Sequence, residues 1–450
     1  MHMFPQLRKI EEKYGDKVVI IGVHSPKFPA ERETANLREA VLRYRIDHPV
    51  VNDRDFEIWH RFAGRAWPTL MFIDPEGRVI GKHEGELPFD QFDRLVAGML
   101  RAFEERGLLA EGPADLGLAT LREPDGPLRF PGKVLATDDA LYIADTNHHR
   151  IVMARPDGTV VTAIGNGQPG LLDGAATMAQ FQQPQGLALA NGILYVADTE
   201  NHAIRAIDLA TGNVRTLAGT GEQALRPGDG GPGRSTPLSS PWDLALDRGR
   251  LYIAMAGTHQ IWSLDLLSAL VAPYAGTGRE GLLDGPPAEA WFAQSSGLAL
   301  AGGHLYVADS EVSAIRDIDL GTGRVTTLVG EGLFVFGDQD GEGEVVRLQH
   351  PLGITVRGEA LFIADSYNNK VKRLDPRTRS VSTWLGSGLA GDTDGPGPTA
   401  AFREPGGVCA GGSGLLIADT NNHRVAVADW ETGIVRTLIG PTSGAPSAQK

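Results

Sequence analysis

The sequence contains a single cysteine, Cys409, and no apolar stretch long enough to span a membrane. One cysteine cannot form an internal disulfide, which excludes the class of small secreted domains held together by disulfides. A transmembrane helix needs about 20 consecutive apolar residues, so we expect no membrane partner. The chain also does not open with the charged and apolar regions of a secretory signal peptide. These absences favour a cytoplasmic protein.

Positive charge is also scarce. The chain has 42 Lys and Arg residues against 56 Asp and Glu residues, which gives a formal net charge of −14. A negatively charged protein repels the phosphate backbone of DNA and RNA. We therefore expect no nucleic-acid partner.

The first part of the chain, residues 1–106, alternates between helical and strand patterns. Apolar residues recur at helical spacing from Met1 to Tyr14 and again from Thr34 to Tyr44, and Val18–Val23 is an apolar run rich in β-branched residues. A strand led by Pro68 ends at Asp74, and after a turn at 75–77 the pattern gives a second strand, Arg78–His83, and a helix, Phe89–Glu105. The pattern predicts a small α/β domain.

A repeat takes over after a linker at residues 107–125. Six phrases align without a gap: LYIADTNHHRI, LYVADTENHAI, LYIAMAGTHQI, LYVADSEVSAI, LFIADSYNNKV and LLIADTNNHRV. Each copy contains four short strand patterns separated by turn residues. Four antiparallel strands repeated six times predict an all-β six-bladed β-propeller over residues 126–440, followed by a flexible tail at 441–450. The sequence leaves open whether the ring closes with whole blades or with an exchanged strand.

An aspartate that recurs in five copies of the repeat raises the question of a metal site. It stands at Asp145, Asp198, Asp309, Asp365 and Asp419. A zinc site needs three or four ligands converging on one ion, whereas residues repeated once per blade are spread around a ring. We interpret each Asp, with the Ser or Thr after it, as a partner of backbone N–H groups in a turn. His148, His202 and His423 are expected to tie neighbouring strands, and we expect no metal and no cofactor.

Asp-Gly pairs form a second repeat, between the blades. They stand at Asp173, Asp229, Asp284, Asp340 and Asp394, each followed by Gly. The segment GDQDGEGE, from Gly337 to Glu344, resembles a calcium loop in its alternating oxygens, but it lacks a glutamate at the spacing that a calcium loop needs. We interpret it as an acidic turn, with calcium as the alternative.

Two copies depart from the repeat. Met255-Ala256-Gly257 replaces Asp-Thr-Asn in the third copy, and Glu311-Val312-Ser313 replaces the polar element in the fourth. Residues that replace the shared ones are not required for the structural contacts that the shared residues make in the other copies. Met255, Gly257, Glu311 and Ser313 are therefore candidate binding residues, with simple drift as the alternative.

The repeated phrases resemble the NHL repeat. The A-D-[ST]-x-N-H-x-[IV] core is best kept at Asp198–Ile204 and Asp419–Val425, and the G-D-G-G-P loop at Gly228–Pro232. The resemblance implies a propeller and leaves function open, because NHL propellers include binding platforms, scaffolds and one metal enzyme, the peptidyl-hydroxyglycine lyase propeller. The sequence shows no isolated histidine cluster that would support such a lyase.

The stretch Trp67-Pro68-Thr69, followed by Asp74–Gly77, resembles the cis-proline element of thioredoxin-like domains. With the propeller behind it, the chain resembles bacterial members of the NHL repeat-containing protein 2 family. That resemblance implies a strand and a cysteine pair before the first helix. Residues 1–110 hold no cysteine, so we expect the domain to be N-terminally incomplete, with the missing strand and cysteines encoded upstream of Met1.

Three functions remain open. The favoured one is a two-domain interaction or scaffold protein that binds an unidentified protein or small ligand at the propeller face or the inter-domain cleft. Trp67, Pro68 and Thr69 are its candidate binding residues in the first domain. The second is a thiol–disulfide oxidoreductase whose cysteines lie upstream, since the chain as given has no thiols in that domain. The third is a metal-dependent propeller hydrolase or lyase.

Overall fold

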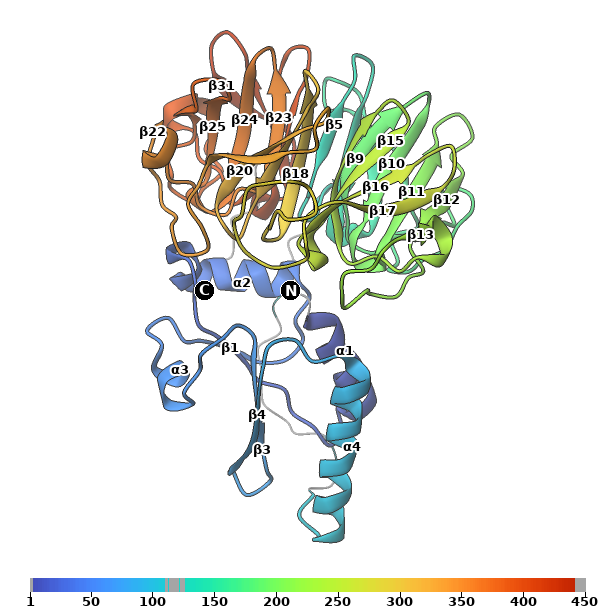
Figure 1. The fold of residues 1–450 in the computed structure, drawn as a ribbon, viewed down its shortest axis with the longest axis vertical. Coiled ribbons are helices and arrows are strands. Elements are labelled where there is room, and N and C mark those ends of the chain that lie inside the picture. The colour runs from blue at the N-terminus through green and yellow to red at the C-terminus, as the bar shows by residue number, and fades with distance from the viewer. Residues whose placement is uncertain (1–2, 110–111, 113–120, 122–125, 442–450) are drawn as a thin grey trace. The chain divides into compact units, whose positions relative to one another are not determined.

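The computed structural model describes residues 3–109, 112, 121 and 126–441. The chain divides into two compact units, Met1–Glu123 and Pro124–Lys450 (Figure 1). Most of the predicted linker and nearly all of the predicted tail lie outside the described residues.

The first unit mixes helices and short strands. Its elements are α1 (Phe4–Tyr14), β1 (Gly22–His24), a 3-10 turn (Pro29–Arg32), α2 (Thr34–Arg43), β2 (Val50–Asn52), α3 (Glu57–Arg61), β3 (Thr69–Ile73), β4 (Val79–Glu84) and α4 (Phe89–Glu105). The predictions for α2, β3, β4 and α4 are confirmed to within two residues at each end. The short elements β2 and α3 were not predicted, because a three-residue strand and a five-residue helix leave too brief a pattern.

The strands of the first unit form two separate pairs. β1 lies parallel to β2, and β3 lies antiparallel to β4. The predicted strand Val18–Val23 was too long, since only Gly22–His24 is paired as a strand. The segment before β1 and the strand β3 contribute to one core, in which Ile20 and Leu70 pack with Ile10 of α1 and Val96 of α4. The first unit therefore has one shared core beneath a sheet that is split in two.

The second unit is a six-bladed β-propeller, as predicted (Figure 1). Blade one comprises β5 (Val134–Ala136), β6 (Leu141–Asp145), β7 (Arg150–Ala154) and β8 (Val160–Ile164); blade two comprises β9 (Pro184–Ala190), β10 (Ile193–Asp198), β11 (Ala203–Asp208) and β12 (Val214–Ala218); blade three comprises β14 (Pro241–Asp247), β15 (Arg250–Met255), β16 (Gln260–Asp265) and β17 (Leu270–Ala275). Blade four comprises β18 (Ser295–Ala301), β19 (His304–Asp309), β20 (Ala314–Asp319) and β21 (Val325–Val329); blade five comprises β23 (Gly353–Arg357), β24 (Ala360–Asp365), β25 (Lys370–Asp375) and β26 (Ser380–Leu385); blade six comprises β28 (Pro405–Ala410), β29 (Gly414–Asp419), β30 (Arg424–Asp429) and β31 (Ile434–Ile439).

Each blade is built from four consecutive strands of the chain, so the ring closes with whole blades. Short strands from the loops between blades add a fifth strand at the outer edge of three of them: β13 (Gly231–Pro232), β22 (Gly341–Glu342) and β27 (Gly395–Pro396). A short 3-10 turn follows the second strand in five of the six blades. These turns are Thr146–His148, Thr199–Asn201, Ala256–Thr258, Ser366–Asn368 and Thr420–Asn422.

The aligned aromatic position of the repeat lies on the second strand of each blade. Its members are all buried, at most 8% exposed: Tyr142, Tyr195, Tyr252, Tyr306, Phe362 and Leu416. The residue after each of them is fully buried as well. The second strands therefore carry the apolar core between blades, which accounts for the regularity of the phrase.

Candidate functional site

The repeated aspartate is an internal structural group. Asp198 is fully buried, and its carboxylate accepts hydrogen bonds from the backbone N–H of Gln182 at 2.7 Å and from Asn201 at 2.8 Å. The guanidinium of Arg205, also fully buried, lies 2.7 Å from the same carboxylate. Burial raises the pKa of Asp198 to about 6, while Arg205 and the hydrogen bonds act against that rise. This matches the predicted structural role of the Asp.

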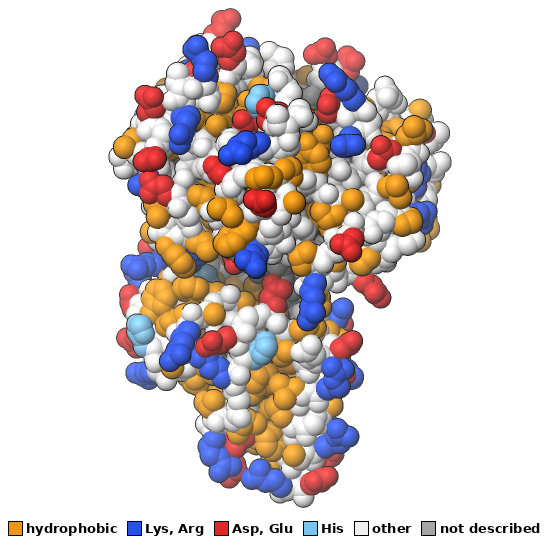
Figure 2. All heavy atoms as spheres, in the orientation of Figure 1, with side chains coloured by type: hydrophobic (Ala, Val, Ile, Leu, Met, Phe, Trp, Pro, Cys, Tyr) orange, Lys and Arg blue, Asp and Glu red, His pale blue; other side chains and the backbone are white. Residues whose placement is uncertain are grey.

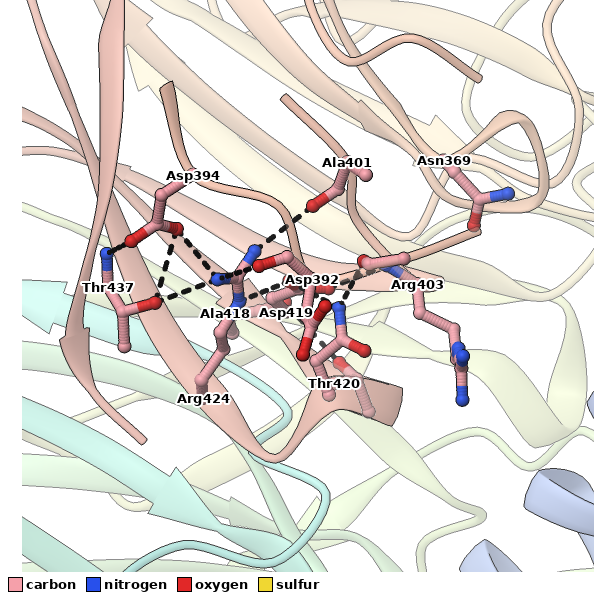
Figure 3. Close-up of polar contacts among 12 residues, drawn as sticks. Asn369, Asp392, Asp394, Ala401, Arg403, Ala418, Asp419, Thr420, Arg424 and Thr437 are labelled. Atoms are coloured by element: carbon pink, nitrogen blue, oxygen red, sulfur yellow. Dashed lines mark hydrogen bonds and ion pairs between the residues drawn. The ribbon is translucent and has the colours of Figure 1, made fainter. Parts of the chain in front are cut away.

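Arg205 also contacts the Asp-Gly pair in the loop before its blade. Arg205 lies 2.9 Å from Asp173 of the Asp-Gly loop, and Asp173 also accepts a hydrogen bond from the hydroxyl of Thr216 at 2.8 Å. In four of the blades the two sequence repeats are therefore the two ends of one network that fixes the incoming loop to its blade. The equivalent groups are Asp309–Arg316–Asp284–Thr327 in blade four, Asp365–Lys372–Asp340–Thr383 in blade five and Asp419–Arg424–Asp394–Thr437 in blade six, shown in Figure 3.

The segment that resembles a calcium loop already faces cations of the chain. Lys372 lies 2.6 Å from Asp338 and 2.7 Å from Asp340, and Lys370 also pairs with Asp338. Burial works in the opposite direction, but hydrogen bonds from Lys372 and from the backbone of Thr383 hold the pKa of Asp340 below its ordinary value. Lysine ammonium groups thus supply the positive charge at this acidic turn.

Blade three lacks both charges of the network. Met255 replaces the aspartate, and Trp262 stands where blade two has Arg205. The sulfur of Met255 accepts the backbone N–H of Ser239 at 3.3 Å, and Trp262 donates to the side chain of Gln260 at 3.0 Å. An anion and its cation have been replaced together by neutral groups that keep the contacts. Met255 has no exposed surface, so it is not available to a ligand in this structure.

The other three candidate residues of the propeller are also held inside the repeat. Ser313 is 1% exposed, and its hydroxyl accepts the backbone N–H of His350 at 3.2 Å. Glu311 approaches the imidazole of His350 at 3.7 Å, with its side chain 16% exposed. A Cβ atom at Gly257 would lie 2.2 Å from the hydroxyl of Ser239, so glycine is required there by packing. Of the four, Glu311 and Gly257 keep some contact with solvent.

A hydrogen bond of the same kind crosses each of the six junctions between blades. In each case a backbone N–H at the start of a blade donates to the side chain of a residue with positive φ in the preceding blade. The pairs are Phe130 to His423, Gln183 to His149, Ser240 to His202, Gln294 to His259, His350 to Ser313 and Glu404 to Asn369. The pair of Phe130 and His423 joins blade one to blade six and closes the ring.

Two details of the sequence prediction for these residues were wrong. His202 and His423 do tie neighbouring blades, but in blade one that position belongs to His149, whereas His148 binds Asp145 of its own blade at 2.8 Å. The error arose from the His-His pair, which permits two alignments. The hydroxyl that follows the aspartate also does not accept turn N–H groups; Thr199, for example, donates to the carbonyl of Pro241 in the next blade at 2.7 Å.

In the first unit, the predicted residues around Pro68 form an aromatic cluster. The Trp67–Pro68 peptide bond is cis, as predicted. Trp67 donates to the backbone carbonyl of Ser25 at 2.9 Å and stacks on Trp59 with ring centroids 4.5 Å apart, yet 48% of it remains exposed. Thr69 donates to the carbonyl of Ala66 at 2.6 Å, so it shapes the turn before β3.

The residues that support this cluster were not predicted from the sequence. Buried Asp53 accepts the backbone N–H groups of Ile58 and Trp59, each at 2.9 Å, and the hydroxyl of Ser25 at 2.8 Å. These bonds hold the first turn of α3, which carries Trp59 beneath Trp67. An aspartate a few residues before a helix is a sequence signal for such a bond, and it was available at Asp53.

Apolar side chains lie exposed in β1, in the segment directly before it and in β2, and Figure 2 shows hydrophobic side chains gathered on the visible face of the first unit. Val19, Ile21 and Val23 are exposed by 47%, 58% and 43%, and Val51, the partner of Val23 on β2, by 41%. Isolated exposed apolar residues are common, but these four β-branched residues, two on adjacent strands and two in the segment before β1, form a patch. The structure therefore brings an apolar strand surface and an exposed tryptophan together in one small unit.

Within the described ranges, no three His, Cys, Asp or Glu side chains gather closely enough to hold a metal ion. No helix in the described part of the chain is long and apolar enough to cross a membrane.

Comparisons with known proteins agree with the repeat architecture. Residues 181–207 match the NHL repeat family. The human protein NHL repeat-containing protein 2 is 41% identical over 97% of this chain. The chain is a homologue of NHL repeat-containing protein 2. It spans 66% of the length of that human relative, just under two thirds.

Two further relatives extend the comparison. The protein SUPPRESSOR OF QUENCHING 1, chloroplastic, of Arabidopsis thaliana is 41% identical over 96% of the chain, which covers 43% of that longer relative. The thiol-disulfide oxidoreductase YkuV of Bacillus subtilis is 23% identical over 75 residues, 17% of this chain and 51% of its own. The relatives at 41% identity therefore match nearly the whole chain, whereas the thiol-disulfide oxidoreductase matches only a short part of it.

Proposed function

We propose that this protein is a polypeptide-binding protein whose first unit is a thioredoxin-like domain that accepts an extended segment of a partner protein. The segment adds as a β-strand between β1 and β3, beside Trp67, at the gap in the sheet that the expected upstream strand of this domain would otherwise fill. The propeller serves as a rigid platform. The observation that carries the proposal is the split sheet of the first unit, with its exposed apolar strand residues.

The backbone of the first unit supports strand addition. Among the described residues, β1 has no strand partner other than β2, and β3 none other than β4. The bond from Trp67 to Ser25 holds the end of β1 against the start of β3. An extended segment can satisfy the N–H and C=O groups of an open strand edge and set its side chains against the exposed valines. A β-strand is therefore the partner that this surface fits.

Aromatic side chains support the same location. Trp67 offers a large exposed ring whose orientation is fixed from beneath by Trp59 and Asp53. A ring that is held in place loses little conformational entropy on binding, and tryptophan is enriched among the residues that dominate binding energy. The partner segment is expected to place a side chain on this ring.

A peptide titration tests the proposal. The probe is a fluorescent heptapeptide of alternating valine and threonine, and the matched peptide carries proline at every second position, which removes its N–H donors. We expect the first peptide to bind, to change the tryptophan fluorescence and to protect the amides of 19–24 and 69–73 from hydrogen exchange. Ile21→Lys should weaken that binding at least about tenfold, since it places a charge in the apolar strip.

The control variant is Val161→Lys, because Val161 is a β-branched strand residue of the propeller with a similar exposure of 59%. It should bind the peptide as the unmodified protein does. Equal binding of both peptides, or equal loss in the two lysine variants, would rule out strand addition at this edge.

The second candidate function is thiol–disulfide exchange, favoured by the partial similarity to the oxidoreductase YkuV. The present sequence supplies one thiol, Cys409, in the innermost strand of blade six. Burial raises the pKa of the Cys409 thiol. A thiol with a raised pKa is a poor source of the reactive thiolate. Exchange therefore requires cysteines that this sequence does not contain.

We predict that the present chain does not reduce insulin disulfides with dithiothreitol as electron donor, and that Cys409→Ser does not change this. An insulin turbidity assay measures it directly. Activity that is lost in Cys409→Ser would place the redox function in the propeller and contradict this account.

A further inference from the structure

The first strands of the blades share one position at which four of six residues are glycine. The aligned residues are Lys133, Gly186, Asp243, Gly297, Gly353 and Gly407. Glycine is required where neighbouring blades approach each other closely: a Cβ atom at Gly186 would lie 2.4 Å from the Cα of Asp243, and one at Gly407 2.7 Å from the carbonyl oxygen of Gly132. These strands are the innermost of each blade, so the position faces the axis of the propeller.

The two exceptions contact each other. The ammonium group of Lys133 lies 3.7 Å from the carboxylate of Asp243 and donates a hydrogen bond to the backbone carbonyl of Leu352. Lys133 belongs to blade one, Asp243 to blade three and Leu352 to the start of blade five. Alternate blades of a six-membered ring are not neighbours, so these contacts cross the central channel.

The crossing groups are buried and satisfied. The side chains of Lys133 and Asp243 are 7% and 10% exposed. Asp243 also accepts the backbone N–H of Leu244 and that of Leu298 in blade four, each at 2.9 Å. Burial lowers the pKa of Lys133 and raises that of Asp243, and the attraction between the two opposes both shifts. A charged pair with this many partners has a defined geometry.

We propose that Lys133 and Asp243 form a plug that closes the central channel and fastens blades one, three and five to one another. Ligands of the propeller then bind on its faces and do not enter the channel. Such a plug also disfavours rings with another number of blades, because the two side chains reach each other only across this axis.

A double-mutant cycle on the full chain tests the plug. Lys133→Met and Asp243→Leu each leave one buried charge without its partner, and each should lower the thermal midpoint of the propeller by about 5–10 °C. The thermal midpoint of the double variant should lie well above the value expected from adding the two single losses, since no unpaired charge remains. Hydrogen exchange should increase in β5, β14 and β23 of each single variant.

The ion pair of Arg347 and Glu331, at 3.2 Å with side chains 27% and 36% exposed, is the matched control. Arg347→Met and Glu331→Gln should change the midpoint by no more than about 2 °C. If either single plug variant does not fold, the variant Lys133→Gly with Asp243→Gly, which places glycine in all six blades, is measured in its place. It should fold and exchange faster in β5, β14 and β23 than the unmodified protein. Additive midpoints in the cycle, or unchanged exchange in those strands, would overturn the proposal.

Discussion

Replacing Arg205 by methionine is expected to lower the free energy of unfolding of the propeller by about 3–5 kcal/mol. The guanidinium is fully buried and binds Asp198, Asp173 and the carbonyl of Gln180. Its loss leaves the buried carboxylate of Asp198 without a countercharge, and that unpaired charge accounts for most of the cost. Urea denaturation followed by circular dichroism measures it.

Blade three provides the reason to expect a partial rescue. There, Met255 and Trp262 replace both charges at once, and the blade packs as the others do. Adding Asp198→Met to Arg205→Met should therefore recover a substantial part of the lost stability, although the double variant has fewer charges than the single one. Arg215, exposed on the neighbouring strand β12, provides a control: Arg215→Met should change stability by less than about 0.5 kcal/mol. A double variant less stable than Arg205→Met would show that the network does not act as a charge pair.

The propeller could be predicted from the sequence because the pattern of each strand recurs in six copies of the repeat. An alternating phrase that recurs at intervals of 53 to 57 residues averages out local ambiguity, so the blade count and the strands of blade two were predictable. The buried partner of Asp198 was harder to predict. Blades two, four and five use Arg205, Arg316 and Lys372, each seven residues after its aspartate, whereas blade six uses Arg424, five residues after its aspartate. Long cationic side chains reach one carboxylate from two positions, so no fixed spacing marks them.

The first unit was less predictable because its pattern occurs only once. Val18–Val23 has the composition of a full strand, but a strand forms only where a neighbour supplies hydrogen bonds, and β2 pairs with Gly22–His24 alone. The cluster around Trp67 was located from a short resemblance, whereas the support from Asp53 required knowledge of where α3 begins. The plug was missed because Lys133 and Asp243 are 110 positions apart, and only the closed ring places them together.

The junction between blades six and one should be sensitive to acid. His423 is 6% exposed, and its Nδ1 accepts the backbone N–H of Phe130 at 3.1 Å, which requires a neutral imidazole. Burial, together with the positive charges of Arg129 and Arg403, lowers the pKa of His423 to about 4; Asp145 acts against this shift and His148 adds to it. The bond that closes the ring therefore depends on an unprotonated histidine.

The sign of the effect follows from the two pKa values. The unfolded chain binds a proton at His423 near pH 6.5, and the folded chain only near pH 4, so the stability gained from this residue is complete above pH 6.5 and is lost as the pH falls toward 4. The shift corresponds to roughly 3 kcal/mol. Blade five shows how to remove the titration and keep the bond, since Asn369 accepts the N–H of Glu404 at 2.9 Å at the equivalent junction.

We therefore expect His423→Asn to fold at pH 7 with near-normal stability and to lose less stability than the unmodified protein between pH 6.5 and pH 4. His423→Ala, which leaves the N–H of Phe130 unpaired, should lose about 1–3 kcal/mol at pH 7. Urea denaturation of the three proteins at pH 7, 5.5 and 4.5 measures both effects, and the groups common to all three cancel in the comparison. Parallel pH profiles for the asparagine variant and the unmodified protein would mean that protonation of His423 does not govern the junction, and that the contact between Thr420 and Pro131 holds it closed instead.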